Sequence, residues 1–490
     1  MRPDYILSAL AIVLTGFGLL ALTPILVALY YCDYSSILPF ISASIVSIVT
    51  GRFFAAISGA RNNFNDLNKK EALLIVSLTW VMVSCIAAIP YLFYGFSLIN
   101  ALFEAVSGIT TTGATILTNF SYPKTVFFWR AMSQWLGGMG IIILFIAVLP
   151  QFAVAGRQMF FAEVPGPTEE KITPRIRQTA SLLWMVYAIL TVAEIICLKI
   201  AGMPWFDSIC NSLATISAGG FSPNPSSIMG YNNNEVIWVI TFFMFLSGCN
   251  FALQYRVFFQ GQFKALITNE EFKFYTKIFL VFSCFLAFTL MYHNHFGFSD
   301  AIRDAMFQII SIITSTGFAS ADFDLWANAS KVLIFAMMFI GGSAGSAGGG
   351  IKVVRVLIII KYLIREITQI LHPRAVLPLK IGNMVIPADV LRQIVGFVMF
   401  YFVIFILSSG ITSMIEENIV LGVTGSAATI GNIGPGFMGI GPMQSFNGLH
   451  VVTKIIYICN MLVGRLELIP FLAMLHVDFW KIKFEGKNNA

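Results

Sequence analysis

Four short segments of the chain place small polar residues and glycine inside otherwise apolar sequence. They read Thr110-Thr111-Thr112-Gly113-Ala114, Ser217-Ala218-Gly219-Gly220-Phe221, Thr314-Ser315-Thr316-Gly317-Phe318 and Gly431-Asn432-Ile433-Gly434-Pro435. The marked glycines, Gly113, Gly220, Gly317 and Gly434, are 107, 97 and 117 residues apart. Glycine adopts the unusual backbone angles that aim successive carbonyl oxygens at one axis. Four such turns at membrane depth could surround a cation with carbonyls, as the filter of a channel does.

The chemistry expected of these segments is the exchange of a cation's water shell for carbonyl oxygens. The sequence predicts that the filter is built from Thr111, Thr112, Gly113, Ala218, Gly219, Gly220, Ser315, Thr316, Gly317, Asn432, Ile433 and Gly434. In the second and fourth segments a neighbouring glycine leaves the register open. The competing interpretation is that the glycines only let helices pack closely.

The residues upstream of the first three segments predict the helices that position them. Thirteen residues before the glycine stand Asn100, Asp207 and Asp304, and these residue types are preferred N-caps. We therefore expect a capped helix of about three turns that ends at each glycine, with the negative end of its dipole directed toward a cation. The fourth segment departs from this pattern, because Leu421 occupies the equivalent position.

Composition places these elements in a membrane. Hydrophobic residues make up 57% of the 490 residues, charged residues 11%, and the mean hydropathy is +0.82. Soluble domains carry about 25% charged residues. Ten apolar runs are long enough to span a bilayer, which takes roughly 20 residues. They are 5–31, 36–60, 71–96, 124–150, 176–201, 235–260, 272–296, 330–361, 385–413 and 447–475. Each glycine segment lies between two runs and is too short to cross twice, so we expect half-helices that enter and return.

The distribution of lysine and arginine predicts the orientation. With a cytoplasmic N-terminus, the inner ends and loops hold 23 of the 30 basic residues, and both termini lie inside. The net charge of +6 then reflects membrane topology, and nucleic-acid binding need not be invoked. The seven cysteines are scattered and show no metal-binding spacing. No pattern of a catalytic site supports a membrane enzyme.

A second site is expected at the run Gly341–Gly350, which contains six glycines in ten residues. Each glycine costs about 1 kcal/mol in a helix relative to alanine, so a continuous helix is disfavoured here. Irregular backbone at this depth is tolerated only beside water or inside protein. We expect a movable loop below the filter, with gate residues Gly345, Gly348, Gly349, Gly350 and Lys352. A phosphate-binding loop is excluded because Ile351 separates glycine from lysine.

Arg465 would place a fixed positive charge at the depth of this gate, because it follows the small-residue step of the last apolar run. A charged side chain at such a depth usually marks an ion pathway. A structural salt bridge with Glu467 is the competing interpretation.

These motifs resemble those of the potassium-uptake superfamily of Trk, Ktr and plant HKT transporters, and the length favours the TrkH/TrkG branch. The resemblance rests on TTTGAT at 110–115, SAGGFS at 217–222, TSTGFAS at 314–320, NIGPGF at 432–437, GGSAGSAGGGIK at 341–352 and GRLEL at 464–468. It implies an all-α integral membrane fold with four span–pore-helix–span repeats around one central pore, preceded by two extra transmembrane helices. The implied boundaries are 1–62 for these two helices and 63–157, 158–261, 262–364 and 365–490 for the repeats.

The resemblance also implies function. Potassium, K+, would be the transported ion in a bacterial inner membrane, and Gly113 implies that K+ is admitted, since sodium-selective plant members carry serine there. A homodimer is implied, with a cytoplasmic TrkA-like nucleotide-binding regulatory subunit. NAD or ATP would bind that partner and no nucleotide would bind this chain. Arg465 would lie in the pore below the filter. The alternative is an obligately H+- or Na+-coupled secondary transporter, which would usually show inverted repeats with broken helices.

Overall fold

The computed structural model describes residues 2–59, 68–147, 172–375, 377–382, 384–466, 474 and 476–480. Within these ranges the fold is predominantly helical and several helices are long and apolar enough to cross a membrane. The longer helices are α1 (Pro3–Leu20), α3 (Ile37–Ser58), α4 (Lys69–Phe93), α6 (Lys124–Ala147), α8 (Ile172–Ile200), α13 (Glu270–Asn294), α16 (Val353–Leu371) and α17 (Ala388–Ile415). Three further helices belong to the later apolar runs: α10 (Asn234–Ser247), α15 (Asn328–Met337) and α19 (Val451–Arg465).

Four short apolar helices lie between these, namely α5 (Leu98–Ile109), α9 (Trp205–Ile216), α14 (Phe298–Ile313) and α18 (Ile419–Ile430). The remaining elements are α2 (Thr23–Tyr30), η1 (Tyr34–Ser36), η3 (Ser227–Tyr231), α11 (Phe251–Phe258), α12 (Lys264–Thr268), η4 (Phe323–Leu325), η5 (Phe446–Gly448) and α21 (Val477–Trp480), with a two-stranded antiparallel hairpin of β1 (Lys380–Ile381) and β2 (Met384–Val385).

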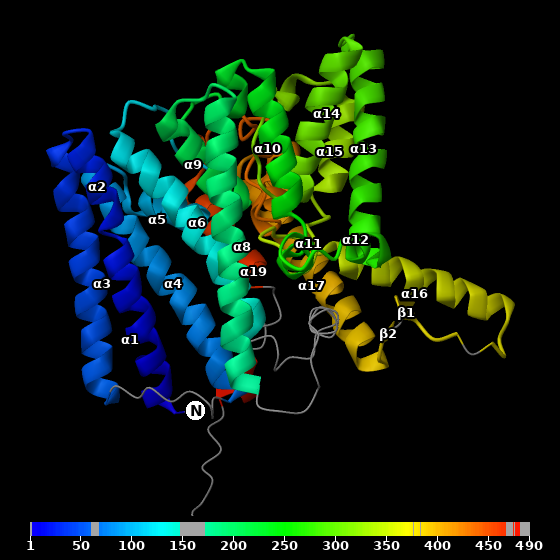
Figure 1. The fold of residues 1–490 in the computed structure, drawn as a ribbon, viewed down its shortest axis with the longest axis horizontal. Helices are drawn as coiled ribbons and strands as arrows, with labels where there is room; N and C mark the ends of the chain where they lie inside the picture. Colours follow the sequence, from blue (N-terminus) through cyan, green and yellow to red (C-terminus); the bar gives the residue numbers. More distant parts are fainter. Residues whose placement is uncertain are drawn as a thin grey trace, which may run out of the picture.

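The N-terminal helices pack closely on each other at one side of the molecule (Figure 1). Serine side chains of α3 reach the backbone of α1: Ser44 Oγ donates to the Gly18 carbonyl and Ser47 Oγ to the Leu14 carbonyl, both at 2.7 Å. A Cβ on Gly18 would lie 2.7 Å from Ile48 Cγ1, so glycine allows this close approach. Small residues at such an interface are typical of helices that associate in a membrane.

The predicted N-caps of the short helices were wrong. The structure starts α5 after Ser97, α9 after Pro204 and α14 after Gly297, so Asn100, Asp207 and Asp304 lie inside the helices. In α5, Ser97 Oγ accepts from the Asn100 amide N–H at 3.4 Å. The polar positions have other partners: Asn100 Oδ1 accepts from Lys454, and Asp304 Oδ1 accepts from the Ser320 hydroxyl. Their recurrence therefore reflects tertiary contacts and not capping.

Three of the ten predicted spans are interrupted in the described residues. The run 5–31 divides at residues 21–22 into α1 and α2, which still count as one span, and two other runs break more sharply. In the run 235–260, α10 and α11 meet at an angle of 106°, with a break at Gly248–Asn250. In the run 330–361, α15 ends at Met337, a non-helical stretch follows, and α16 then runs across the end of α13 instead of beside it (Figure 1). The absence of helix over Gly341–Gly350 confirms the prediction made from its glycines. Counted by length and composition within the described ranges, six helices could span a membrane, or seven with the bent pair.

Candidate functional site

The four glycine segments share one backbone conformation at the C-terminal ends of α5, α9, α14 and α18. Each helix ends at an isoleucine four residues before the marked glycine. In the first segment the Thr112 amide donates to the Ser107 carbonyl at 2.8 Å and the Thr111 amide to the Gly108 carbonyl at 3.0 Å. This pair of bonds is the Schellman motif. The same pair recurs in the other three segments, with the longer-span bond at 2.8 Å each time.

The residue in the left-handed conformation of each motif is not glycine. These residues are Thr111, Ala218, Ser315 and Asn432, with φ between 52° and 56°. Left-handed backbone is disfavoured for residues with a Cβ, and most of all for β-branched threonine. The marked glycine follows two residues later and also has positive φ, from 77° to 104°. The repeated geometry fixes the register that the sequence left open: Gly220 and Gly434 are the equivalents of Gly113 and Gly317.

The four segments adjoin one another in a closed ring. A Cβ placed on Gly113 would lie within 3.0 Å of the Gly219 carbonyl oxygen of the next segment. The same relation holds between Gly220 and the Thr316 carbonyl, Gly317 and the Ile433 carbonyl, and Gly434 and the Thr112 carbonyl. The last of these returns to the first segment. All twelve residues predicted for the filter therefore lie in one ring, onto which the C-terminal ends of four short helices converge.

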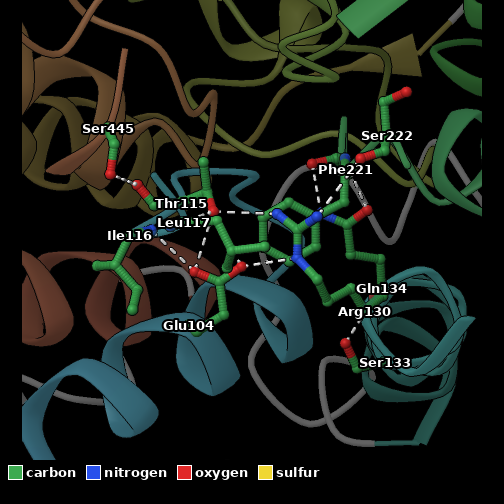
Figure 2. A network of polar contacts seen from close by, with 11 residues as sticks. Glu104, Thr115, Ile116, Leu117, Arg130, Ser133, Gln134, Phe221, Ser222 and Ser445 are labelled. Carbon is green, nitrogen blue, oxygen red and sulfur yellow. Dashed lines mark hydrogen bonds and ion pairs between the residues drawn. The ribbon is translucent and has the colours of Figure 1, made fainter. Parts of the chain in front are cut away.

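A buried ion pair lies beside the end of the first segment and bonds to the residues that follow it (Figure 2). Arg130 Nε of α6 donates to Glu104 Oε1 of α5 at 2.7 Å, and the two side chains are 2% and 0% exposed. The Glu104 carboxylate also accepts from the Thr115 hydroxyl and, at 2.9 Å, from the Ile116 amide. Arg130 reaches the second segment as well, where Nη1 donates to the Ser222 carbonyl at 3.4 Å. The pair thus links two neighbouring segments of the ring.

The third and fourth segments are braced differently. The Phe318 carbonyl, next to Gly317, accepts from Ser311 Oγ at 2.6 Å and from Gln308 Nε2 at 3.2 Å. In the fourth segment the Asn432 side-chain amide donates to Thr112 Oγ1 at 2.9 Å, which connects the last segment to the first. The four quarters of the ring therefore share a backbone and differ in their supporting side chains.

The glycine-rich loop Gly341–Gly350 lies against the helix ends of the third and fourth segments. A Cβ on Gly348 would lie 2.7 Å from the Thr314 carbonyl, and one on Gly349 would lie 2.6 Å from the Gly431 carbonyl. The Gly349 amide donates to Ser315 Oγ at 2.6 Å. Side chains at these loop positions would collide with the ring, so the glycines permit the loop to sit directly beside it.

Basic side chains and the break between α10 and α11 hold the loop. Arg465, 2% exposed, donates from Nη1 to the Ala347 carbonyl at 3.0 Å and from Nη2 to the Gly137 carbonyl of α6 at 3.2 Å. Lys352 Nζ donates to the Gly348 carbonyl. The Gly248 carbonyl accepts from the Ser343 amide at 2.9 Å, and the Gly345 carbonyl from the Phe251 amide at 3.2 Å. Glu467, the predicted alternative partner of Arg465, lies outside the described residues.

Sequence reasoning did not assign three of the supporting residues, namely Glu104, Gln308 and Arg130. Glu104 and Gln308 occupy the same position, nine residues before their glycines, and this coincidence was a usable signal. For Arg130 the sequence gave no signal except a basic residue in an apolar run, because its partner Glu104 lies on another helix.

Comparison with known proteins identifies the family. Residues 40–482 match the model of the TrkH family, described as a cation transport protein. The chain is 36% identical to the Trk system potassium uptake protein TrkH of Vibrio parahaemolyticus, over 98% of this chain and 100% of the relative. It is 33% identical to TrkG of Escherichia coli over 95% of this chain and 96% of the relative. The crystal structure of the potassium transporter TrkH from Vibrio parahaemolyticus superimposes with a TM-score of 0.90 and 32% identity, covering 98% of this chain and 100% of that one.

A family match of this extent, joined to the ring and the loop beside it, leaves one conclusion. The chain belongs to the TrkH family of cation transport proteins.

Proposed function

We propose that this protein is a potassium-uptake membrane transporter of channel-like construction, which passes K+, and Rb+ by its similar size, through the ring of four glycine segments. The observation that carries the proposal is the cyclic contact of each marked glycine with the carbonyl before the next one. Such a ring presents several carbonyl oxygens around one axis, and carbonyls replace the water shell of K+. The converging helix ends add partial negative charge where the cation would sit.

The loop Gly341–Gly350 would act as the gate. It lies beside the ring, and its backbone carbonyls are held by Arg465 and Lys352. Hydrogen bonds to charged groups contribute about 1.5–3 kcal/mol each, which is enough to bias a loop between two positions. The obligately coupled transporter would usually show broken helices, and α10 and α11 are separated by such a break. The backbone at this break hydrogen-bonds to the loop Gly341–Gly350, so we assign the break to the gate.

The repeats 63–157, 158–261, 262–364 and 365–490 would each supply one quarter of the ring, after the two-helix segment 1–62. The bacterial inner membrane, cytoplasmic termini, a homodimer and a cytoplasmic TrkA-like regulatory subunit complete the proposal. NAD or ATP would bind the subunit, and the gate would receive its signal from there.

The test is cation flux by the purified protein in liposomes with defined gradients. We expect a K+ gradient alone to drive K+ or Rb+ flux, with Na+ passing much more slowly. Flux that requires an imposed H+ or Na+ gradient would favour the obligately coupled transporter. Equal flux of K+ and Na+ through correctly folded protein would contradict the proposed filter.

A further inference from the structure

One side chain of α6 holds the second segment on both sides of its ring glycine. Gln134 is fully buried and lies one helical turn after Arg130 (Figure 2). Its Nε2 donates to the Gly219 carbonyl at 2.6 Å, and its Oε1 accepts from the Phe221 amide at 3.0 Å. Because the Phe221 amide can only donate, the orientation of the Gln134 side-chain amide is fixed.

The bonded carbonyl belongs to the ring itself. Gly219 O is the oxygen that Gly113 approaches from the first segment. The side chain of Gln134 also lies against the Gly219 Cα, since a Cβ there would be 2.5 Å from Gln134 Cδ. Among the described residues, no donor reaches the equivalent carbonyls of Thr112, Thr316 and Ile433. One carbonyl of the four is therefore fixed and polarised by a neutral donor.

The hydrogen bond to the Gly219 carbonyl bears on how the ring would select between cations. Discrimination between K+ and Na+ depends on the size of the cavity and on the number and field strength of its carbonyl dipoles. A donated N–H fixes the direction of the Gly219 carbonyl and shares its negative charge with the amide. The fixed positive charge of Arg130 stands one turn away, 4.0 Å from the Phe221 ring centroid, and is paired with Glu104.

We propose that Gln134 is a positioning residue that sets the cation selectivity of the ring by holding the Gly219 carbonyl. The inference rests on the proposed function, since it assigns a role within the same filter. Among the described residues, the second segment is then the one whose ring carbonyl is held by a side-chain donor. Loss of the amide would leave this carbonyl free to turn toward or away from the ion, and the smaller Na+ would then find ligands at shorter distance.

The test compares K+ and Na+ flux per inserted molecule for the parent and for Gln134→Met, which keeps the length of the side chain and removes both hydrogen bonds. We expect the K+/Na+ flux ratio to fall by about fivefold, corresponding to about 1 kcal/mol at 1.4 kcal/mol per tenfold. The control is Ser133→Ala, which removes a buried hydroxyl of the same helix that donates only to its own backbone, at Arg130 O. This variant should keep the parental ratio.

A second variant tests the role of Gln134 if Gln134→Met fails to insert into the membrane. Gln134→Asn keeps a neutral amide but shortens the side chain by one methylene, so that the amide no longer reaches both the Gly219 carbonyl and the Phe221 amide. It should lower the ratio in the same direction as Gln134→Met. A merely structural role would lower the amount of inserted protein and leave the ratio unchanged. A parental ratio in either inserted variant would overturn the role of Gln134, whereas a parent that does not select K+ would overturn the proposed function itself.

Discussion

Gly113 keeps its place in the ring because its missing side chain leaves room for the Gly219 carbonyl. Its φ of 81° is also one that residues with a Cβ rarely adopt. Both facts apply to the other three marked glycines. The position is therefore constrained by backbone conformation and by the neighbouring segment together.

We expect Gly113→Ser to lower the K+/Na+ flux ratio by about tenfold or more, which corresponds to about 1.4 kcal/mol. The added Cβ must displace the Gly219 carbonyl, and left-handed backbone costs a residue with a Cβ about 1–2 kcal/mol. Flux of each ion, measured per inserted molecule in liposomes, checks the prediction. Gly410→Ser is the matched control because its Cβ would meet nothing within 4 Å. An unchanged ratio would remove Gly113 from the ion path.

The Glu104–Arg130 pair makes a second residue-scale prediction. Glu104→Gln leaves the Arg130 charge buried without its carboxylate, and breaking a buried pair in this way costs about 3–5 kcal/mol. We expect a lower thermal unfolding temperature in detergent and less inserted protein. The double variant Glu104→Gln/Arg130→Met removes both charges and should recover much of the lost stability. A double variant as unstable as the single one would show that the charge pair is not the cause.

Elements at the ring could be predicted in part. The glycine periodicity located the four turns, because glycine readily adopts positive φ. Each turn also has a non-glycine residue with positive φ, such as Thr111, and the sequence could not predict it because residues with a Cβ rarely adopt this conformation. The break in the run 330–361 was predicted from its six glycines, whereas that in 235–260 was not. There a single glycine and Asn250, which caps α11 by accepting from the Ala252 amide, end one helix and start another.

At the element scale, loosening the loop should raise basal flux. Lys352→Met removes the donor to the Gly348 carbonyl, and a charge-assisted hydrogen bond is worth about 1.5–3 kcal/mol. We expect about a tenfold increase in K+ flux in liposomes that contain no partner subunit. Shortening Gly345–Gly350 should act in the same direction. If the loop only fills space, stability would fall and flux per folded molecule would stay at the parental value.

Arg465 gives the corresponding prediction for the neighbouring carbonyl of the loop, that of Ala347. It donates to the Ala347 carbonyl and to the Gly137 carbonyl of α6. In the proposed pore, where screening is poor, its positive charge would repel cations strongly. Arg465→Ala should therefore increase flux, most of all when combined with Lys352→Met. Flux per inserted molecule is the measurement, with Arg465→Ala/Glu467→Ala as the comparison. A poorly folded single variant and a double variant with recovered folding and parental flux would instead assign a structural salt bridge.

At the scale of the whole molecule, contacts between distant residues were beyond sequence reasoning. Arg130 and Glu104 are 26 residues apart, and Lys454 and Asn100 are 354 residues apart. A single basic residue in an apolar run indicates that its side chain has a partner, but the sequence does not show on which helix that partner lies. The membrane class, the helical fold and the family followed from composition and motifs, because these depend on local sequence and not on which helices meet.

The ring closes between its last and first segments without covalent continuity. Asn432 meets Thr112 across a separation of 320 residues, and Gly434 meets the carbonyl of the same threonine. At about 5–20 residues per second of synthesis, the first segment waits on the order of 15–60 s in the membrane before its partner is made. A nascent chain thus has no complete ring until its final quarter is inserted. If the ring is the proposed filter, selective K+ passage begins only after synthesis of the last segment.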